Sequence, residues 1–584
     1  MQEEHLAPPK TTGEIRLAYI KEQVDKNPVW AIDLIGAYRK AYKVDNETDT
    51  VEVKALFQME GDAAAQLKIL FDKAIDDEKW DEAASYLRSL SVIGIQCETN
   101  EIDIILASAK KQLDEGNNLG AFLSAVQACE RQPLSYDDAM LFFNKAVEGK
   151  QRRTAAFFLD AAEKTGNIGQ IPEGLREYAR GADTPADMIK GIATIVVDKG
   201  IKIEKGRGYA DKVLGSAFFI DLSGLLITNH HVIESEVDPK YEGYSRLYIR
   251  MGDSASPRFP ARVIGWDKAL DLALIKTEYK TDFVFSVVDN IIPNVGDTVL
   301  ALGSPLGLDR TVTQGIVSNL SRRFLQIGDV IQIDAAVNAG NSGGPVVDTS
   351  GRLIGIVFAG LLQYQGLNFA VPARRLAEAL PALIKGGKAK RPWLGMTVCE
   401  TPSGAEIIYT SPNTPAARHF VPEGSIIKSI NGQTIQAPQS MIIPALQDAV
   451  FQTFAGELVA IETIDQNGSS ATHILMTVPR PEIPLVDAIK LDNRERLAAP
   501  LFGMVLSPGF EKYKLSAYQV KKIVRGSVAD EAGISENDPV RIRSFKVFEE
   551  YGLAVMEIDI KKRSMGYLET SMQLPGYLDS PDTL

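Results

Sequence analysis

The spacing of apolar residues changes at Gly181-Ala-Asp-Thr-Pro185, and this change limits the possible folds more than any other feature. Before it, the first ~165 residues form long amphipathic stretches rich in Ala, Leu, Lys and Glu, which is typical of α-helices. After it come about a dozen short apolar runs bounded by glycine or polar turns, such as 192–197 and 353–357. Runs of this kind indicate an all-β barrel or sandwich. The sequence therefore predicts a multidomain protein with a helical N-terminal region and a β-rich remainder.

One pattern recurs within the helical region. The segments 73–90, 111–128 and 145–162 start 38 and 34 residues apart, and each contains an apolar helix end, a polar turn and a second helix start. Small residues lie at the same offset in each segment: Ala83-Ala84, Ala121 and Ala155-Ala156. We therefore predict helix–turn–helix units resembling tetratricopeptide repeats over 1–180, which would offer a groove to a protein partner. The alternative is an irregular helical bundle whose similarity is compositional.

Composition narrows the class of protein. A length of 584 residues implies roughly three to five domains. The net charge of −13 gives no electrostatic attraction to nucleic acid or to an anionic membrane. No apolar run reaches the roughly 18–20 residues of a membrane helix, and the first residues lack a signal-peptide core. We expect either a cytoplasmic protein or a mature form whose export signal has been removed.

Three cysteines, Cys97, Cys129 and Cys399, lie far apart in the sequence. Their number excludes a disulfide framework, and their spacing does not match a metal site. We interpret them as small buried hydrophobic residues, and we expect neither a metal nor a cofactor.

Two β-rich segments, near 393–480 and 498–584, follow a glycine-containing basic linker at 386–392. Each begins with an apolar–glycine–apolar motif, which reads Trp393-Leu-Gly-Met396 in the first and Leu501-Phe-Gly-Met504 in the second. The two segments look like two copies of one module.

The motif Gly340-Asn-Ser-Gly-Gly-Pro345 carries the most specific chemical signal. A serine hydroxyl needs a base and a set of donors for the developing oxyanion before it can attack a carbonyl. Glycines around Ser342 allow the tight loop in which successive N–H groups converge. We therefore predict Ser342 as a nucleophile, with the N–H groups of Gly340 and Ser342 as the oxyanion hole. The alternative is a glycine-rich hairpin turn.

The pair His230-His231 lies at the end of an apolar run and provides a candidate base. Imidazole suits a base that works near neutral pH. We expect the pair at the end of a strand, where only one ring can face Ser342. A metal site is disfavoured because no nearby Cys or clustered His completes a ligand set.

A third member is Asp271, which we place inside an otherwise apolar strand. A buried carboxylate needs a partner, and the N–H of an imidazole is one. Asp267 is the rival carboxylate, and we expect it to be a solvated loop residue. The chain order His, Asp, Ser is that of trypsin-like enzymes.

The motifs TNHHVI, DLALIK, ALGSPLGL, TVTQGIVS, IQIDAAVNAGNSGGPVVD and LNFAVPARRL resemble the protease domain of the HtrA/Deg family. The two β modules resemble the PDZ domains of that family. The resemblance covers about 186–584 and implies an all-β trypsin-like double barrel. It assigns the role of base to His231, because the family's catalytic histidine directly precedes a valine.

We therefore predict four domains: a helical region at 1–180, a protease domain at 186–388, and PDZ-like domains at 391–482 and 498–584. The second PDZ-like domain is degenerate, because Glu536-Asn-Asp-Pro539 lacks a Gly-Asp turn.

Substrate selectivity is predicted from the residues around the nucleophile. Ala336, six residues before Ser342, stands where a charged residue would select basic side chains, and Val337 lies beside it. We expect a preference for small or medium aliphatic residues. An extended substrate would pair with Phe358, Ala359 and Gly360 as an added strand.

The first apolar–glycine–apolar motif predicts a second binding site. Leu394, Gly395 and Met396 would offer N–H groups to the C-terminal carboxylate of a peptide. The alternative interpretation of these residues is an ordinary strand start.

The resemblance also implies a serine endopeptidase that acts on unfolded or misfolded proteins in extracytoplasmic quality control, as a homotrimer or larger assembly. Two other functions stay open. One is a client-binding chaperone or scaffold with minor proteolysis. The other is an esterase or acyl transferase that uses the same three residues.

Overall fold

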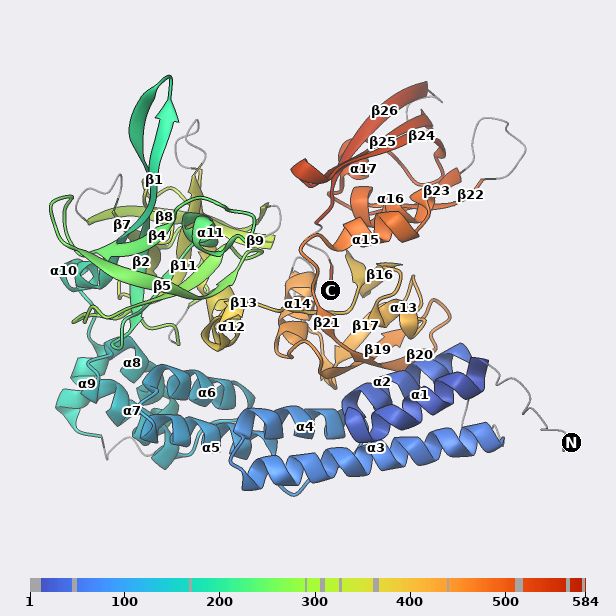
Figure 1. Cartoon of the computed structure of the whole chain (residues 1–584), viewed down its shortest axis with the longest axis horizontal. Helices are drawn as coiled ribbons and strands as arrows, with labels where there is room; N and C mark the ends of the chain where they lie inside the picture. The colour runs from blue at the N-terminus through green and yellow to red at the C-terminus, as the bar shows by residue number, and fades with distance from the viewer. Residues whose placement is uncertain are drawn as a thin grey trace, which may run out of the picture. The chain divides into compact units, whose positions relative to one another are not determined.

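The computed structural model describes residues 12–44, 50–166, 171–288, 291–304, 310–324, 328–360, 367–437, 441–509, 518–562, 568–579 and 583–584. These residues form two compact units, one made of 1–99 with 390–584 and the other of 100–389 (Figure 1). None of the described helices is long and apolar enough to cross a membrane.

The first helices of the chain belong to the first unit. Side chains cap two of them, because Asn27 Oδ1 accepts from Trp30 N and Thr50 Oγ1 accepts from Val53 N. The helices are α1 (Thr12–Lys26), α2 (Pro28–Ala41), α3 (Val51–Asp76) and α4 (Trp80–Val92). The predicted helical N-terminal region is confirmed, and the resemblance to tetratricopeptide repeats stays a prediction.

The remaining helices of this region belong to the second unit, where they share a core with the β-barrels. Phe122, Phe142 and Phe158 are buried in the same cluster as Phe218 and Ile227 of the first barrel. These helices are α5 (Glu101–Asp114), α6 (Asn118–Arg131), α7 (Tyr136–Glu148), α8 (Arg152–Glu163), α9 (Glu173–Arg180) and α10 (Pro185–Met188), followed by a 3₁₀ turn, η2 (Ile189–Gly191).

The first barrel is an antiparallel sheet in the order β5-β4-β1-β2-β3-β6, closed by pairing of β6 with β5. Its elements are β1 (Ile192–Glu204), β2 (Arg207–Asp221), β3 (Leu225–Thr228), α11 (His230–Val237), β4 (Arg246–Arg250), β5 (Arg258–Asp267) and β6 (Leu272–Thr277). A short strand, β13 (Gly387–Lys388), adds parallel to β5. The ends of β1 and β2 project beyond the barrel as a hairpin (Figure 1).

The second barrel closes in the order β10-β11-β12-β9-β8-β7. Its elements are β7 (Thr298–Gly303), β8 (Thr311–Phe324), β9 (Gly328–Ile333), β10 (Pro345–Asp348), β11 (Leu353–Gly360), β12 (Asn368–Pro372) and the closing helix α12 (Ala373–Lys385). Apolar side chains from alternate strand positions fill each barrel. The predicted trypsin-like double barrel is confirmed.

The first PDZ-like module has a sheet in the order β15-β16-β17-β19-β20. Its elements are β14 (Pro392–Trp393), β15 (Met396–Thr401), β16 (Gly404–Thr410), α13 (Pro415–Arg418), β17 (Ile426–Ile430), β18 (Gln433–Thr434), α14 (Ile442–Phe451), β19 (Leu458–Ile464), β20 (Ser470–Met476) and β21 (Val478–Pro479).

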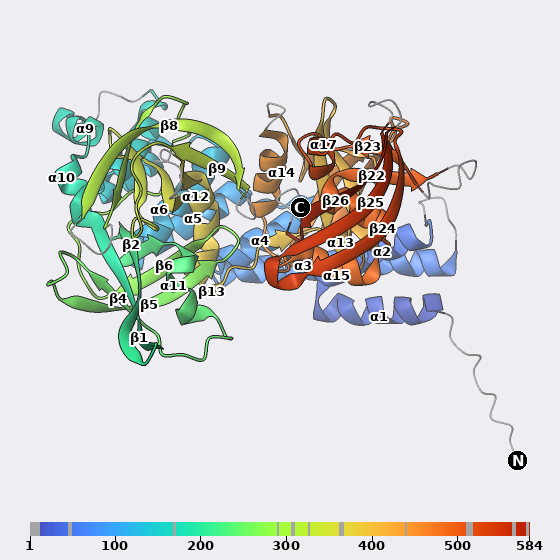
Figure 2. The ribbon, with the colours of Figure 1, turned by 90° about the horizontal axis from the view of Figure 1, so that it is seen from above.

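The second PDZ-like module has a sheet in the order β22-β23-β24-β25-β26, whose last three strands are long (Figure 2). Its elements are α15 (Pro484–Leu491), α16 (Arg494–Phe502), β22 (Met504–Pro508), β23 (Tyr518–Ile523), α17 (Val528–Glu531), β24 (Pro539–Phe548), η6 (Glu549–Tyr551), β25 (Leu553–Lys562) and β26 (Leu568–Tyr577). Tyr409 of the first module is buried in the core of the second.

A buried carboxylate on α2 joins the N-terminal helices to the first PDZ-like module. Asp33 is fully buried. Its oxygens accept from Arg418 Nη1 at 2.6 Å and Met476 N at 2.6 Å, and Oδ1 lies 3.1 Å from His419 Nε2. The Arg418 guanidinium also lies over the Trp30 ring, 5.0 Å from its centroid. One aspartate therefore holds three groups that lie more than 380 residues away in the chain.

Replacing Asp33 by Ala is expected to lower the free energy of unfolding of this unit by about 3–5 kcal/mol. The variant leaves the Arg418 charge and the Met476 amide without their acceptor. A urea titration followed by tryptophan fluorescence measures the change, because three of the four tryptophans (Trp30, Trp80 and Trp393) lie in this unit. Asp62→Ala on the exposed face of α3 is the matched control. Equal midpoints for the Asp33 and Asp62 variants would contradict the expectation.

A second buried group makes the stability of the same unit depend on pH. Burial, together with the smaller effects of Lys40 and His419, lowers the pKa of His473 on β20 to about 4. The unfolded chain has an ordinary pKa of about 6.5, so between these values it binds more protons than the folded chain. The contribution of neutral His473 is fully present above about pH 6.5. As the pH falls toward 4, this contribution is lost, and the free energy of unfolding decreases by up to about 3 kcal/mol.

The expected result is a fall in the urea midpoint of the parent protein between pH 7.5 and pH 5. His473→Gln should show a smaller fall, because glutamine does not titrate in this range. An identical fall in both proteins would contradict the assignment.

Candidate active site

The loop that carries Ser342 connects β9 to β10 and is built on glycines. Gly340 and Gly343 have φ angles of +101° and +88°, which L side chains rarely adopt. A Cβ atom at position 343 would also collide with the Ser216 carbonyl and the Thr228 hydroxyl. The loop can therefore lie directly against β2 and β3 only with glycine at this position.

Hydrogen bonds to β2 and β11 fix the backbone of this loop. Ser216 N donates to Ser342 O at 2.8 Å, and Ser216 Oγ donates to Gly340 O at 2.6 Å. Gly343 N donates to Val357 O at 2.8 Å. The N–H groups of Gly340 and Ser342 donate to no residue in the described ranges. Two amides next to the Ser342 hydroxyl are thus available to an oxygen from outside the chain.

The histidine pair lies at the start of α11 rather than at the end of a strand, so the predicted placement is wrong. The strand β3 ends at Thr228, and the helix begins at His230. Successive helical residues differ in direction by roughly 100°. His230 is therefore buried while His231 is exposed. The two rings have different surroundings, as expected, but the cause is helical rather than strand geometry.

Asp271 fixes His231 through both carboxylate oxygens. Oδ1 accepts from His231 N at 2.8 Å, and Oδ2 lies 2.7 Å from His231 Nδ1. The Asp271 carbonyl oxygen accepts from His230 N at 3.2 Å and from Asn229 Nδ2 at 2.8 Å. The first turn of α11 and the turn before β6 are thereby held together. Sequence reasoning missed Asn229, whose only signal is its place directly before the histidine pair.

The placement of both carboxylates differs from the prediction. Asp271 does not lie inside a strand, because it precedes β6 and has a φ angle of +55°. Aspartate tolerates this left-handed conformation better than most side chains. Asp267 was expected to be solvated, which is wrong. It ends β5, is 4% exposed, and its Oδ1 accepts from Ala269 N and Leu270 N. Asp267 therefore shapes the turn that presents Asp271.

Burial lowers the pKa of His230 below its usual value, and the negative charge of Asp271 opposes this shift only in part. His230 is consequently neutral at neutral pH. It places no positive charge beside the exposed His231.

The Ser342 hydroxyl donates to the Phe358 carbonyl oxygen at 3.4 Å, a long hydrogen bond. Both Ser342 and His231 are among the described residues, and no hydrogen bond joins Ser342 Oγ to the His231 ring. The catalytic hydrogen bond between a serine hydroxyl and a histidine ring is often long in a free enzyme and shortens when the substrate binds.

The residues predicted for substrate selectivity lie in the loop before Ser342 and at the end of β11. Ala336 is exposed in the loop before Ser342, and its carbonyl oxygen accepts from Thr313 Oγ1 at 2.9 Å. Val337 is half-buried against the barrel core. Phe358 is buried in β11, where the backbones of residues 359 and 360 pair with β12. The solvent exposure of Ala359 and Gly360 lies outside what the structure describes.

The predicted carboxylate loop of the first PDZ-like module contacts an oxygen. Leu394 N, Gly395 N and Met396 N donate to Leu584 O at 3.1, 2.9 and 3.2 Å. Gly395 has a φ angle of +83°, which lets the three N–H groups converge. Sequence reasoning missed Leu584, which belongs to none of the motifs recognised in the sequence.

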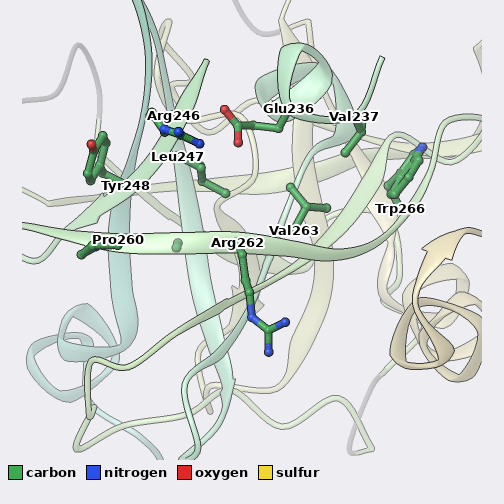
Figure 3. Close-up of a pocket in the computed structure, with 10 residues that line it drawn as sticks. Glu236, Val237, Arg246, Leu247, Tyr248, Pro260, Arg262, Val263 and Trp266 are labelled. Atoms are coloured by element: carbon green, nitrogen blue, oxygen red, sulfur yellow. The ribbon is translucent and has the colours of Figure 1, made fainter. Parts of the chain in front are cut away.

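A hollow on the outside of the first barrel lies away from these residues. Its lining side chains come from the C-terminal end of α11, from β4 and from β5, and include Glu236, Arg246 and Trp266 (Figure 3). Ser342, His231 and Asp271 do not line it. Among the described residues, no group of three or more His, Cys, Asp or Glu side chains is placed to hold a metal ion.

Two closed six-stranded barrels, with a serine loop on one and a histidine–aspartate pair on the other, define a trypsin-like serine protease. The comparisons with known proteins agree. The family model described as a trypsin-like peptidase domain matches residues 215–356, and the TP0546 family PDZ domain matches 485–578. A domain of unknown function, DUF8517, matches 12–105.

Two relatives are both named probable periplasmic serine endoprotease DegP-like. The protein from Marinomonas sp. (strain MWYL1) is 30% identical over 57% of this chain and 71% of its own length. The protein from Pseudomonas putida (strain GB-1) is 35% identical over 38% of this chain and 48% of its own length. A solved structure, the HtrA-type protease AlgW with decapeptide, is 26% identical over 51% of this chain and 97% of its own, with a TM-score of 0.41. The chain belongs to the family of DegP-like serine endoproteases.

Proposed function

We propose that Ser342 is the nucleophile of this serine endoprotease, that His231 is its general base and that Asp271 orients the base. The observation that carries the proposal is the double contact of the Asp271 carboxylate with His231 N and Nδ1, at 2.8 and 2.7 Å. A proton held on Nδ1 leaves Nε2 as the ring nitrogen that can accept the proton of Ser342.

The reaction then proceeds by an acyl-enzyme. Ser342 Oγ attacks the scissile carbonyl carbon as its proton moves to His231 Nε2. The peptide C–N bond breaks as the same proton passes to the leaving amine. Water, deprotonated by His231, attacks the ester, and the acid product and Ser342 are released. Asp271 stays ionised and stabilises the imidazolium formed in each half-reaction.

The oxyanion of each tetrahedral intermediate would lie against the N–H groups of Gly340 and Ser342. Their availability and the positive φ of Gly340 support this role. Removal of one such donor typically costs about 2.7–4 kcal/mol in the barrier.

The substrate proposal is an unfolded or misfolded protein, cleaved after small or medium aliphatic residues. Ala336 and Val337 bring no charge to the loop before Ser342, and β11 offers backbone at Phe358, Ala359 and Gly360 for an added strand. The relatives' names place those proteins in the periplasm, and quality control there is the role proposed for this chain.

The proposal has three further parts. A peptide docks at Leu394, Gly395 and Met396. The chain assembles as a homotrimer or larger oligomer, and the N-terminal helices bind a protein partner.

The test is digestion of a reduced, carboxymethylated protein and of the same protein in its folded state, with the cleaved bonds mapped by mass spectrometry. We expect cleavage of the unfolded form, mostly after Ala, Val, Ile or Leu. Hydrolysis of small esters without cleavage of either protein would contradict the proposal and favour an esterase.

A further inference from the structure

The carboxylate loop of the first PDZ-like module is occupied by the chain itself. The three amides of Leu394, Gly395 and Met396 all donate to Leu584 O. Three N–H groups that converge on one oxygen form a site for a carboxylate. Leu584 O therefore lies where the carboxylate of a bound peptide would lie.

The Leu584 side chain fills an apolar pocket of the same module. It is 3% exposed and belongs to the module's own core cluster, with Leu394, Met396, Leu446 and Val450. Burial of a leucine side chain is favourable, and the module could equally bury a leucine of another protein. The pocket therefore fits an aliphatic last residue.

Thr583 and Leu584 extend the sheet as a short antiparallel strand beside β15. Leu584 N donates to Met396 O at 2.8 Å, and Thr583 lies opposite Thr397. Main-chain pairing of this kind is how an extended peptide adds to a sheet edge.

Polar contacts join Arg480 to residues before and within this strand. Asp579, which is 4% exposed, forms an ion pair with Arg480 at the end of β21, and Arg480 Nη2 donates to Thr583 Oγ1 at 3.3 Å. Leu578, just before Asp579, is buried in the core of the second module. The occupying residues are thus tethered on one side to the second module and bound on the other side by the first.

We propose that Thr583-Leu584 is an intramolecular ligand of the first PDZ-like module, and that a protein partner's C-terminal peptide with an aliphatic last residue binds there only by displacing it. The proposal rests on the peptide-docking role assigned above to the Leu394–Met396 loop. A ligand on a short tether competes at an effective concentration in the millimolar range. An external peptide of moderate affinity is therefore largely excluded until the two modules separate.

The test measures binding of a fluorescein-labelled peptide, Leu-Asp-Ser-Pro-Asp-Thr-Leu with a free carboxylate, by anisotropy. The full chain carries Ser342→Ala, so that the peptide is not cleaved. Leu584→Asp in this background should empty the pocket and bind the peptide at least tenfold more tightly than the parent. Leu491→Asp, at an exposed leucine of α15, is the matched control and should bind like the parent.

A disulfide trap provides a second variant in case Leu584→Asp does not fold. Thr397 and Thr583 face one another as a non-hydrogen-bonded antiparallel pair, in which the Cα atoms are close, so Thr397→Cys with Thr583→Cys should form a bridge. The oxidised variant is expected to bind no peptide. Reduction should restore the parent's weak binding. The single variants control for the native buried Cys399.

Equal affinity of the parent and Leu584→Asp, or undiminished binding by the oxidised trap, would overturn the intramolecular ligand. Failure of every variant to bind the peptide would overturn the docking role of the loop together with this inference. Cleavage of unfolded protein by the Ser342 enzyme would be unaffected in either case, so the two failures are distinguishable from failure of the protease assignment.

Discussion

Replacing Ser342 by Ala is expected to reduce kcat for cleavage of an unfolded protein by about 10⁶-fold, to the level of the uncatalysed background or close to it. Alanine removes the atom that would form the acyl-enzyme, and neither His231 nor the free amides of the loop can supply another covalent partner. Release of fragments from fluorescein-labelled casein measures the loss.

The control is Ser350→Ala, a serine in the turn that follows β10. It should keep the activity of the parent. Thermal unfolding of the Ser342 variant should match that of the parent, because within the described residues the hydroxyl makes a single long hydrogen bond. Comparable activity of the Ser342 variant and the parent would reject the mechanism.

Replacing Asp271 by Asn is expected to lower kcat by about 10⁴-fold with little change in KM. The amide nitrogen of asparagine would donate to His231 Nδ1, which places the ring proton on Nε2. A protonated Nε2 cannot accept the proton of Ser342. The fold should persist, because asparagine can still accept from His231 N and adopts the left-handed conformation of position 271 as readily as aspartate.

Asp267→Asn separates this role from that of the neighbouring carboxylate. Asp267 Oδ1 accepts from the turn amides of Ala269 and Leu270, so its replacement should reduce stability far more than it reduces kcat. A larger loss of kcat in the Asp267 variant than in the Asp271 variant would reassign the orienting carboxylate.

Local signals predicted a barrel or sandwich and singled out Ser342, the histidine pair and Asp271, whereas the resemblance to the HtrA/Deg family implied the double barrel and selected His231. Short apolar runs with turn residues reveal strands, and the glycines at 340, 343 and 344 reveal a tight loop around Ser342. The local backbone at the histidine and aspartate was predicted wrongly. A strand and the first turn of a helix look alike over two residues, so His230-His231 gave no sign that β3 had already ended.

The misplacement of the carboxylates has a related cause. Asp267 looks like an ordinary polar residue in a turn, yet its carboxylate is buried because the turn amides of Ala269 and Leu270 supply its hydrogen bonds. The positive φ of Asp271 follows from this turn geometry, which the apolar run after it conceals.

The remaining features come from contacts between distant parts of the chain. Nothing around Asp33 indicates a partner nearly 400 residues away, because α2 reads as an ordinary amphipathic helix. The same holds for Leu584, whose role depends on the position of the second module beside the first. Hydrophobic periodicity shows which face of an element is buried, but not what covers it.

Covalent labelling of the nucleophile is the most direct test of the protease assignment. The parent protein and Ser342→Ala would be treated with diisopropyl fluorophosphate and analysed by mass spectrometry, intact and after digestion. The account predicts one diisopropylphosphoryl group per chain, on the peptide that contains Ser342, with labelling abolished in the variant and slowed in proportion to activity by Asp271→Asn. A label on another residue, or an unlabelled parent that still cleaves unfolded protein, would contradict it.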